Sequence, residues 1–261
     1  MVIARHKNML SIATWNIHKG FSQFNRRMMV HELRERLRAL DADIVFLQEV
    51  QGQHLRHAER HATWPTQPQH EFLAEGVWGS HAYGRNMVYD HGHHGNAILA
   101  RFPITATHNQ DVTRLRFEKR GLLHCAITVP GLDQPLHCVC AHLSLFGRSR
   151  RHQLDALAVH IEMRVPHDAP LLIAGDFNDW RNRAHELLAT RLGMEEVFAG
   201  PDTRPSLSFP AMLPLFRLDR IYMRGLIIEA GTVHHGQPWS AISDHAALSA
   251  RFSFIPAVAG D

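Results

Sequence analysis

The chain has 261 residues, of which 45% are hydrophobic and 20% are charged, which is typical of a globular protein and excludes disorder or fibrous repeats for most of its length. Lys and Arg number 28 against 25 Asp and Glu, and this small positive excess permits a polyanionic substrate without indicating one. The unusual count is 22 histidines, which favours metal-dependent or acid–base chemistry because histidine is both a metal ligand and a proton carrier near neutral pH.

Apolar runs alternate with amphipathic segments along the chain. Residues 27–40 place Val30, Leu33, Leu37 and Leu40 at helical spacing, with arginine and glutamate between them, and so predict a helix. A strand over 9–17 precedes this helix, and a strand over 44–47, a short helix over 51–62 and a loop over 64–69 follow it. The pattern then predicts several short strands between 78 and 143, and a helix over 149–164 with Leu154, Leu157, Val159 and Ile161 as its apolar positions. The rest of the chain is predicted to form a strand over 171–174, a helix over 182–190, a loop over 200–214 and two or three strands ending near Phe254.

The order of these elements predicts the fold class. Strands dominate, helices interrupt them, and the sequence contains neither an internal repeat nor a low-complexity linker. We therefore predict one α/β domain over residues 1–261, in which two sheets bury apolar strands and helices lie outside them.

The cysteines and the hydropathy of the chain indicate where in the cell the protein is located. Cys125, Cys138 and Cys140 lie in apolar runs, and the last two share one face of a strand, which is a poor geometry for a zinc knuckle. Buried, reduced thiols follow, and they favour a reducing compartment. No run approaches the roughly 18 apolar residues of a membrane span, and residues 9–13 are too short an apolar stretch for a secretory signal. We expect a cytoplasmic protein without a transmembrane segment.

Polar residues gather at the ends of apolar strands, where rigid backbone can hold side chains accurately. Taken singly, each has a structural explanation: Asp176 could shape a turn, His142 could be a hydrogen-bonded core histidine, and Asp219 could pair with a neighbouring arginine, Arg217 or Arg220. The six segments concerned are Thr14–His18, Leu47–Val50, Cys140–Leu143, Ala174–Asp179, Leu218–Tyr222 and Ser243–His245.

Together these segments supply the groups that phosphoryl transfer at a hard metal requires. Magnesium takes oxygen ligands, typically one or two carboxylates with water and a substrate phosphate. A metal bound in this way polarises the phosphoryl oxygen and stabilises the leaving oxygen. A second carboxylate can orient the attacking water, and histidines can donate to the phosphate oxygens.

Eight segments, spread over nearly the whole chain, carry a family resemblance. They are TWNIHKG (14–20), LQEV (47–50), GNAILARFPI (95–104), KRGLL (119–123), CAHLSL (140–145), AGDFNDW (174–180), RLDRIYMRG (217–225) and SDHAALSA (243–250). In this order they resemble the endonuclease/exonuclease/phosphatase superfamily of DNase I-like, metal-dependent phosphohydrolases, and within it a YbhP-like group of small bacterial proteins. The GDFND and SDH pieces are common alone, whereas the complete set is specific.

The resemblance implies a fold and a metal site. The fold is a four-layer α/β sandwich, with two central mixed β-sheets flanked by helices, which agrees with the elements predicted above. The metal is Mg²⁺, for which Mn²⁺ can substitute. Glu49 resembles its principal ligand, Asn16 would ligate it or orient its shell, and Asp244 would bind it directly or through water.

The same resemblance implies catalytic roles. Asp176 resembles the aspartate that orients or deprotonates the attacking water, and Asn178 the asparagine that positions water and phosphate. His245 resembles the histidine at the phosphate, and Asp219 the acid that holds it. His142 resembles a second histidine on the other side of the phosphate, as general acid or as donor.

Other positions are weaker candidates. Asn96 and Arg120 lie in matching segments and could contact the phosphate, although Arg120 also fits a solvated strand end. His18 could line the pocket. Residues His91–His94 look like a metal-binding tract, but we interpret them as a surface turn. The histidines at helical positions are expected to be solvated: His54, His57, His61, His152, His160 and His185.

The sequence predicts the type of reaction more narrowly than it predicts the substrate. We expect a phosphate-ester substrate and a nuclease-like phosphodiesterase, although no long insertion is present that could wrap a duplex. One alternative is a sphingomyelinase-like phospholipid diesterase, because the apolar segment Phe209–Phe216 could contact a lipid. Another alternative is a phosphatase. A catalytically silent binding module is a remote alternative, which the intact motif set opposes.

Overall fold

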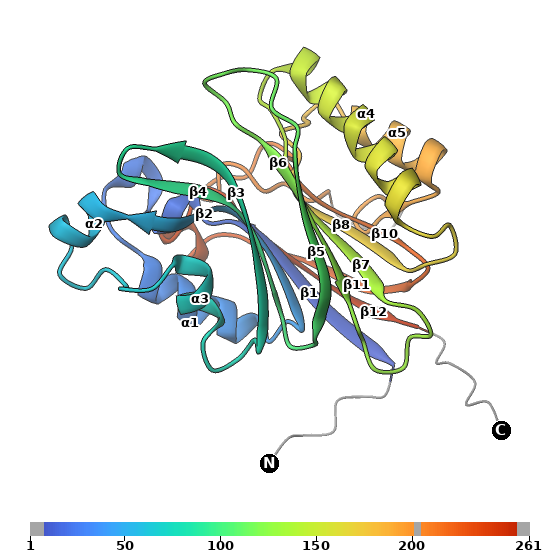
Figure 1. Ribbon diagram of the computed structural model, residues 1–261, viewed down its shortest axis with the longest axis horizontal. Coiled ribbons are helices and arrows are strands. Elements are labelled where there is room, and N and C mark those ends of the chain that lie inside the picture. The colour runs from blue at the N-terminus through green and yellow to red at the C-terminus, as the bar shows by residue number, and fades with distance from the viewer. Residues whose placement is uncertain (1–7, 201–204, 255–261) are drawn as a thin grey trace.

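Two six-stranded β-sheets pack face to face in the computed structural model, which describes residues 8–200 and 205–254 (Figure 1). The first sheet has the order β11 (Ile227–His234), β12 (Ala247–Ser253), β1 (Met9–Asn16), β2 (Ile44–His54), β4 (Gly92–Ala100) and β3 (Ser80–Tyr89). The second has the order β5 (Ile104–Asp111), β6 (Gly121–Ile127), β7 (Leu136–His142), β8 (Leu171–Asp176), β10 (Asp219–Arg224) and β9 (Glu195–Glu196). The pairs β1–β2 and β7–β8 are parallel and the other pairs antiparallel, so both sheets are mixed.

Helices cover the outer face of each sheet (Figure 1). In the first sheet, α1 (Val30–Leu40) and α3 (Gln69–Ala74) share an apolar cluster with the outward side chains of β1 and β2. In the second, α4 (Gly147–Arg164) and α5 (Arg183–Leu192) share another with β7 and β8. A third cluster fills the space between the sheets. The four-layer α/β sandwich expected from the sequence is therefore confirmed.

The central strands are apolar on both faces because both faces are covered. In β1, Ile12 points into the core between the sheets and Trp15 toward the helices, and in β2 the same division holds for Phe46 and Leu47. Such strands give continuous apolar runs rather than an alternating pattern. This explains why the strands over 9–17 and 44–47 were recognisable from the sequence.

Several predicted elements differ from the structure. The predicted helix over 51–62 is wrong at its start, because β2 continues to His54 by pairing with β4 and only α2 (Leu55–Arg60) is helical. The helix predicted over 27–40 begins at Val30, and α3 was not predicted. Val159, expected on the apolar face of α4, is exposed. Residues 201–204 of the predicted 200–214 loop lie outside the described residues, as do residues 1–7.

Histidine positions were also misjudged. The interpretation of His91–His94 as a surface turn is wrong for its last three residues, which form the start of β4. His160, expected to be solvated, is buried at 3% exposure and contacts His124. Nothing in the α4 sequence indicates this, because the partners of His160 come from distant strands.

The cysteine prediction is confirmed: Cys125, Cys138 and Cys140 are buried and free, in the core between the sheets. In the described part of the chain, no helix is both long enough and apolar enough to cross a membrane.

Candidate active site

The first sheet brings Asn16, Glu49 and Asp244 to one edge. β1 and β2 run parallel with Asn16 opposite Gln48, so the end of β1 lies beside Glu49, at the irregularity within β2. β12 runs antiparallel to β1, so the segment just before it returns to this end. There the Ser243 hydroxyl donates to the backbone oxygen of Asn16 at 2.7 Å, which fixes the position of the neighbouring Asp244.

The second sheet brings His142, Asp176 and Asp219 together. His142 ends β7 and lies opposite Asp176, which ends the parallel strand β8. Asp219 begins β10 and lies opposite Asp176 on its other side. All three residues are buried, so their mutual distances are set by strand register rather than by flexible loops.

Two backbone features shape this edge. Gly175 has φ +146°, and a Cβ there would lie 1.9 Å from the carbonyl oxygen of Ala141, so only glycine allows β7 and β8 to approach this closely before Asp176. Glu49 has φ +57° at an irregularity in the β2–β4 pairing. A non-glycine residue in this region is strained, and such strain clusters at functional sites.

Asp176 occupies the centre of the site. Its Oδ2 accepts a hydrogen bond from Asn16 Nδ2 at 3.1 Å and lies 3.6 Å from His142 Nε2 and 3.8 Å from His245 Nε2. Its Oδ1 accepts the backbone N–H of Asn178 at 2.9 Å. The carboxylate thus lies between two histidines, with its orientation fixed from the backbone.

Asp219 and His245 form a buried pair, with Nδ1 of the imidazole 2.8 Å from Oδ2 of the carboxylate. The expected alternative partners of Asp219, Arg217 and Arg220, instead bind the carboxylate of Glu196. A carboxylate on Nδ1 fixes the ring orientation and leaves Nε2 facing Asp176.

Burial and neighbouring charges shift the pKa values of Asp176 and His245. Burial raises the pKa of Asp176 to about 7, with Asp219 adding to this effect and His245 opposing it. Burial would lower the pKa of His245, but Asp219 and Asp176 together raise it to about 10. His245 is therefore a cation at neutral pH, beside a carboxyl group whose proton is easily gained or lost.

His142 and Glu49 shift in the opposite direction. Burial, reinforced by Arg120, holds the pKa of His142 well below its ordinary value, so this ring is neutral at pH 7. Burial would raise the pKa of Glu49, but Lys19, followed by His142 and His18, holds it well below its ordinary value. Two histidines therefore face Asp176 in different charge states, and Glu49 is a full carboxylate.

The donor set at the first sheet suits a hard divalent cation. Glu49 supplies an ionised carboxylate, and Asp244, beside the end of β1, adds a second one. Asn16 donates from Nδ2 to Glu49 Oε1 at 3.4 Å, while its Oδ1 accepts the backbone N–H of His18, so Asn16 orients the carboxylate and would bind a metal only by releasing that Oδ1. Carboxylate oxygens are ligands that magnesium prefers, so Glu49 and Asp244 fit the metal that the sequence resemblance implies.

A second grouping is also compatible with a metal. Among the described residues, Asp176, Asp219 and His245 offer ligand atoms within 4.8 Å of one another. Nδ1 of His245 binds Asp219 in the structure, so a cation here would be held by Nε2 or would replace that hydrogen bond. This group is therefore a second candidate for a divalent cation, beside the carboxylates of the first sheet.

The weaker candidates make mainly structural contacts. Asn96 donates to the backbone oxygens of Gly121 and Cys140, and thus links the first sheet to the second. Arg120 binds Glu118 at 3.1 Å and the backbone oxygen of Leu143. His18 lies at the edge of the site, with Nδ1 4.0 Å from Asp244 Oδ1.

Asn178, expected from the resemblance to position water and phosphate, lies beside Asp176. Its backbone N–H donates to Asp176 Oδ1, and its side-chain Nδ2 donates to the backbone oxygen of Leu143 at 2.9 Å.

Two residues near Glu49 were not predicted as site residues: Lys19, and His94 of the tract interpreted as a surface turn. Lys19 has its Nζ 3.1 Å from Glu49 Oε2, and burial, with the charge of Lys19 adding to it and that of Glu49 opposing it, lowers the pKa of His94 to about 4. A signal for Lys19 existed, since it is one of only three lysines in an arginine-rich chain and lies inside the TWNIHKG segment. His94 approaches through the pairing of β2 with β4, which no local pattern reveals.

Known proteins are similar to this chain in sequence or in fold. The Escherichia coli (strain K12) protein YbhP is 46% identical over 239 residues, which cover 92% of this chain and 94% of YbhP. A solved endonuclease/exonuclease/phosphatase from Beutenbergia cavernae has a TM-score of 0.73 at 20% identity, covering 97% of this chain and 74% of that one. Danio rerio TDP2, complexed with a single strand DNA product, has a TM-score of 0.68 at 19% identity, covering 95% of this chain and 100% of that one.

The family model described as endonuclease/exonuclease/phosphatase matches residues 13–245. This range begins within β1, just before Asn16, and ends at His245, and so contains every residue assembled at the site. The resemblance stated from the sequence motifs, including the YbhP-like branch, is confirmed. With the sandwich fold, the motif order and the convergent carboxylates in agreement, the chain belongs to the endonuclease/exonuclease/phosphatase family.

Proposed function

We propose that this protein is a divalent-metal-dependent, nuclease-like phosphodiesterase. The observation that carries the proposal is the position of Asp176 between neutral His142 and protonated His245, beside Asn16 and Glu49. A base between two groups that can donate to phosphate oxygens suits in-line attack of water on a phosphate ester.

The charge state of each side chain sets its proposed role in the hydrolysis. A bound Mg²⁺, held by Glu49 and Asp244 with Asn16 orienting the Glu49 carboxylate, would polarise the phosphoryl oxygen and stabilise the leaving oxygen. Asp176 as carboxylate accepts a proton from the attacking water. His245 donates from Nε2 to a phosphate oxygen while Asp219 keeps its ring in place. His142, as a neutral ring, donates a second hydrogen bond without adding charge.

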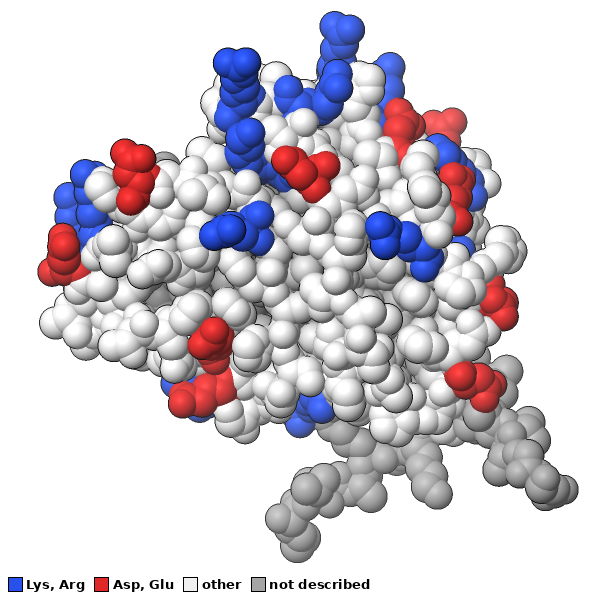
Figure 2. All heavy atoms as spheres, viewed as in Figure 1, with Lys and Arg blue, Asp and Glu red and all other residues white. Residues whose placement is uncertain are grey.

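The surface beside the site supports a polyanionic substrate. The loop between β5 and β6 and the start of α4 expose arginines, and Figure 2 shows Lys and Arg side chains along the upper edge where these segments lie in Figure 1. Phe117 and Phe146, both exposed, bring the two segments into contact at 5.9 Å. The fold is shared with Danio rerio TDP2, solved with a single strand DNA product. The exposed arginines are Arg114, Arg116, Arg148 and Arg151.

The test is a panel of oligonucleotides, plasmid DNA and a model phosphodiester, titrated with Mg²⁺ or Mn²⁺. Glu49→Gln removes the ionised ligand at constant volume, so we expect the metal concentration for half-maximal rate to rise at least about tenfold. Glu186→Gln, a change in the exposed first turn of α5, is the matched control and should leave the metal dependence unchanged. Equal metal dependence in both variants contradicts the ligand assignment, and no hydrolysis of any diester by the wild type contradicts the function.

A phospholipid diesterase is a second candidate, favoured by one observation. The loop between Phe209 and Phe216 exposes Met212 at 70% and Leu213 at 68%, while the ring of Phe209 contacts His245 at 5.0 Å. An apolar tip joined directly to a catalytic residue is a plausible means of contacting a bilayer surface.

This candidate predicts a specific loss. Changing Met212 and Leu213 together to serine should reduce liposome binding and lipid hydrolysis at least about tenfold, because apolar area at the interface is lost. Hydrolysis of a water-soluble diester by the same variant is the control and should not change. Absence of both liposome binding and lipid hydrolysis in the wild type dismisses the lipid substrate.

We also propose a cytoplasmic location. The three buried, free cysteines support it, because reduced thiols are the rule in reducing compartments.

A further inference from the structure

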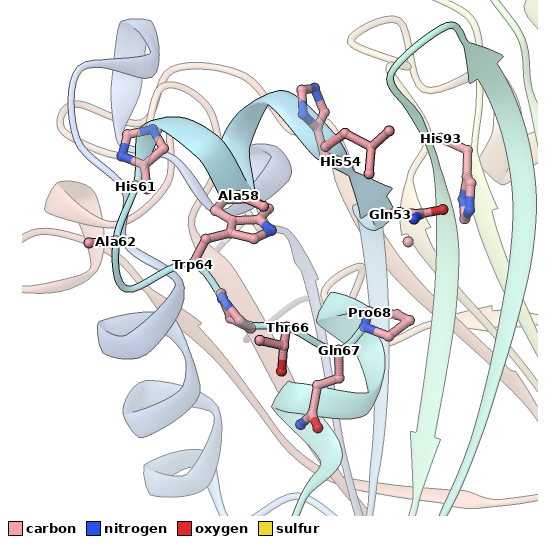
Figure 3. Close-up of a pocket in the computed structure, with 13 residues that line it drawn as sticks. Gln53, His54, Ala58, His61, Ala62, Trp64, Thr66, Gln67, Pro68 and His93 are labelled. Atoms are coloured by element: carbon pink, nitrogen blue, oxygen red, sulfur yellow. The ribbon is translucent and has the colours of Figure 1, made fainter.

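A hollow of about 520 Å³ lies beside the Glu49 end of the site, and the proposed hydrolysis does not use it. Ten residues line it: Lys19, Phe21, Asn25, Gln51, His54, His57, Arg60, His61, Tyr89 and His94. His54 and His61, which flank α2, also line a neighbouring hollow, shown in Figure 3 with Trp64, Pro68 and His93. The histidine-rich segment around α2 is therefore the wall of a concave surface, and not the solvated helix face that the sequence suggested.

The hollow is continuous with the catalytic edge. Lys19 lines it, and its Nζ lies 3.1 Å from Glu49 Oε2. Gln51 lines it from the same strand as Glu49, two residues further on. A substrate whose phosphate lies at Asp176 and Glu49 can therefore extend into this space with the group attached to that phosphate.

Planar rings form one wall. The rings of His54 and His57 are stacked with centroids 3.6 Å apart, and Phe21 lies 4.8 Å from His57. Tyr89 contacts His54 at 5.6 Å. Burial, with neighbouring histidines adding to it, lowers the pKa of His57 to about 4, so this ring is neutral at pH 7. Neutral aromatic rings of this kind are platforms on which nucleic acid bases stack.

Three polar atoms of residues that line the hollow are buried and have no hydrogen-bond partner among the described residues: Gln51 Oε1, His57 Nδ1 and His94 Nδ1. Gln51 is only 1% exposed, so its free acceptor is a costly feature in a folded protein. Buried polar groups of this kind require an explanation, and a ligand whose hydrogen-bonding edge draws one of these side chains toward the hollow supplies one. A purine or pyrimidine presents such an edge in the plane of its ring.

The charged side chains that line the hollow favour some classes of ligand over others. The ten lining residues, all in the described part of the chain, include Lys19 and Arg60 but neither aspartate nor glutamate. Glu49, which is not itself a lining residue, offsets the charge of Lys19, so Arg60 is the lining cation that a choline or ethanolamine head group would meet. An uncharged base attached to a phosphate has no such penalty.

We propose that this hollow binds the base of a nucleotide whose phosphate lies at the catalytic edge, with the His54–His57 stack as platform and Gln51 reading the base edge. The inference rests on the proposed phosphodiesterase function, and it makes the substrate a nucleic acid or a nucleotide diester rather than a phospholipid.

The experiment compares three probes by calorimetric titration of the full chain with Mg²⁺: adenosine monophosphate, ribose phosphate and inorganic phosphate. Stacking of one base supports an affinity for adenosine monophosphate at least about tenfold above that for ribose phosphate. His57→Ala removes part of the platform. Gln51→Met removes the free acceptor at similar volume, together with the side-chain hydrogen bond between Gln51 and Tyr89. Each should reduce the preference for adenosine monophosphate at least about threefold and leave the ribose phosphate affinity unchanged.

His152→Ala, at an exposed position of α4, is the matched control and should keep the full preference. Equal binding of adenosine monophosphate and ribose phosphate overturns the inference, as does a loss that affects both probes alike in the two variants. Asp176-dependent hydrolysis of a diester without base preference overturns only the inference. Base preference in a protein that hydrolyses no diester supports the hollow and overturns the proposed function.

Discussion

Replacing Asp176 by asparagine is expected to lower kcat for a phosphodiester by about 10²–10⁴-fold, the usual contribution of a general base. The change keeps the shape of the side chain, and its amide oxygen can still accept the backbone N–H of Asn178. What disappears is the ability to take a proton from water between His142 and His245. Initial rates at saturating substrate and metal, measured over a range of pH, test this.

The same variant should still fold cooperatively. Asp176 is buried close to Asp219, so removing one ionisable group relieves an unfavourable arrangement, whereas the new amide nitrogen would face the Asn16 Nδ2 donor that Oδ2 now accepts from. Thermal unfolding should therefore show one cooperative transition with a midpoint within a few degrees of the wild type, which separates lost chemistry from lost structure. Asp155→Asn, the same change at an exposed position of α4, is the control for both measurements. A rate for Asp176→Asn within a few-fold of wild type would sink the assignment.

Strand recognition succeeded where burial is continuous and failed where long-range pairing decides the structure. Leu171–Asp176 is buried throughout and its first four residues are apolar, so the sequence over 171–174 predicts a strand by itself. Residues 51–54 are polar and read as the start of a helix, yet they extend β2 because Gly92 and His94 of β4 pair with them. Nothing within residues 51–54 encodes that partner. The short helix α3 was missed for a similar reason, since its one apolar face is defined by the sheet beneath it.

The sequence predicted where the candidate site residues lie along the strands, but not the contacts between them. Asn16, His142, Asp176 and Asp219 lie at strand ends and Glu49 at an irregularity within β2, and the register of neighbouring strands brings them together within each sheet. Their protonation states depend on through-space distances, which a linear sequence does not contain. The stacking around α2 is likewise invisible, because its rings come from separate segments and histidine spacing alone resembles a solvated face.

A second cluster of histidines, far from the catalytic edge, makes the fold sensitive to acid. His124 in β6 binds His160 of α4 at 3.0 Å and His137 of β7 at 2.9 Å, and the ring of His108 stacks on His160. Burial, with the neighbouring histidines and Arg164 adding to it, lowers the pKa of His124 to about 3 and that of His160 to about 4. Two neutral, buried imidazoles are thus built into the folded state.

Stability should therefore fall as pH drops from about 6.5 toward 4. In that window the unfolded chain binds a proton at each histidine, near its ordinary pKa, whereas the folded protein does not bind it until the lower folded value is reached. Each group contributes about 1.4 kcal/mol per pH unit. Between about pH 7 and pH 5, His124 and His160 together should cost about 2–4 kcal/mol of unfolding free energy, since their direct contact eases uptake of the first proton.

Urea unfolding at several pH values measures this slope in the wild type and in His124→Phe. The variant keeps a planar ring but cannot titrate, so the slope between about pH 7 and pH 5 should fall by up to one proton's share, about 1.4 kcal/mol per pH unit. His152→Gln, at an exposed position of α4, should keep the wild-type slope. Comparing slopes avoids the offset in absolute stability that the lost His124 hydrogen bonds will cause. An identical slope in wild type and His124→Phe would show that acid sensitivity arises elsewhere, with His57, His70 and His94, whose pKa values burial also lowers, as the next groups to replace.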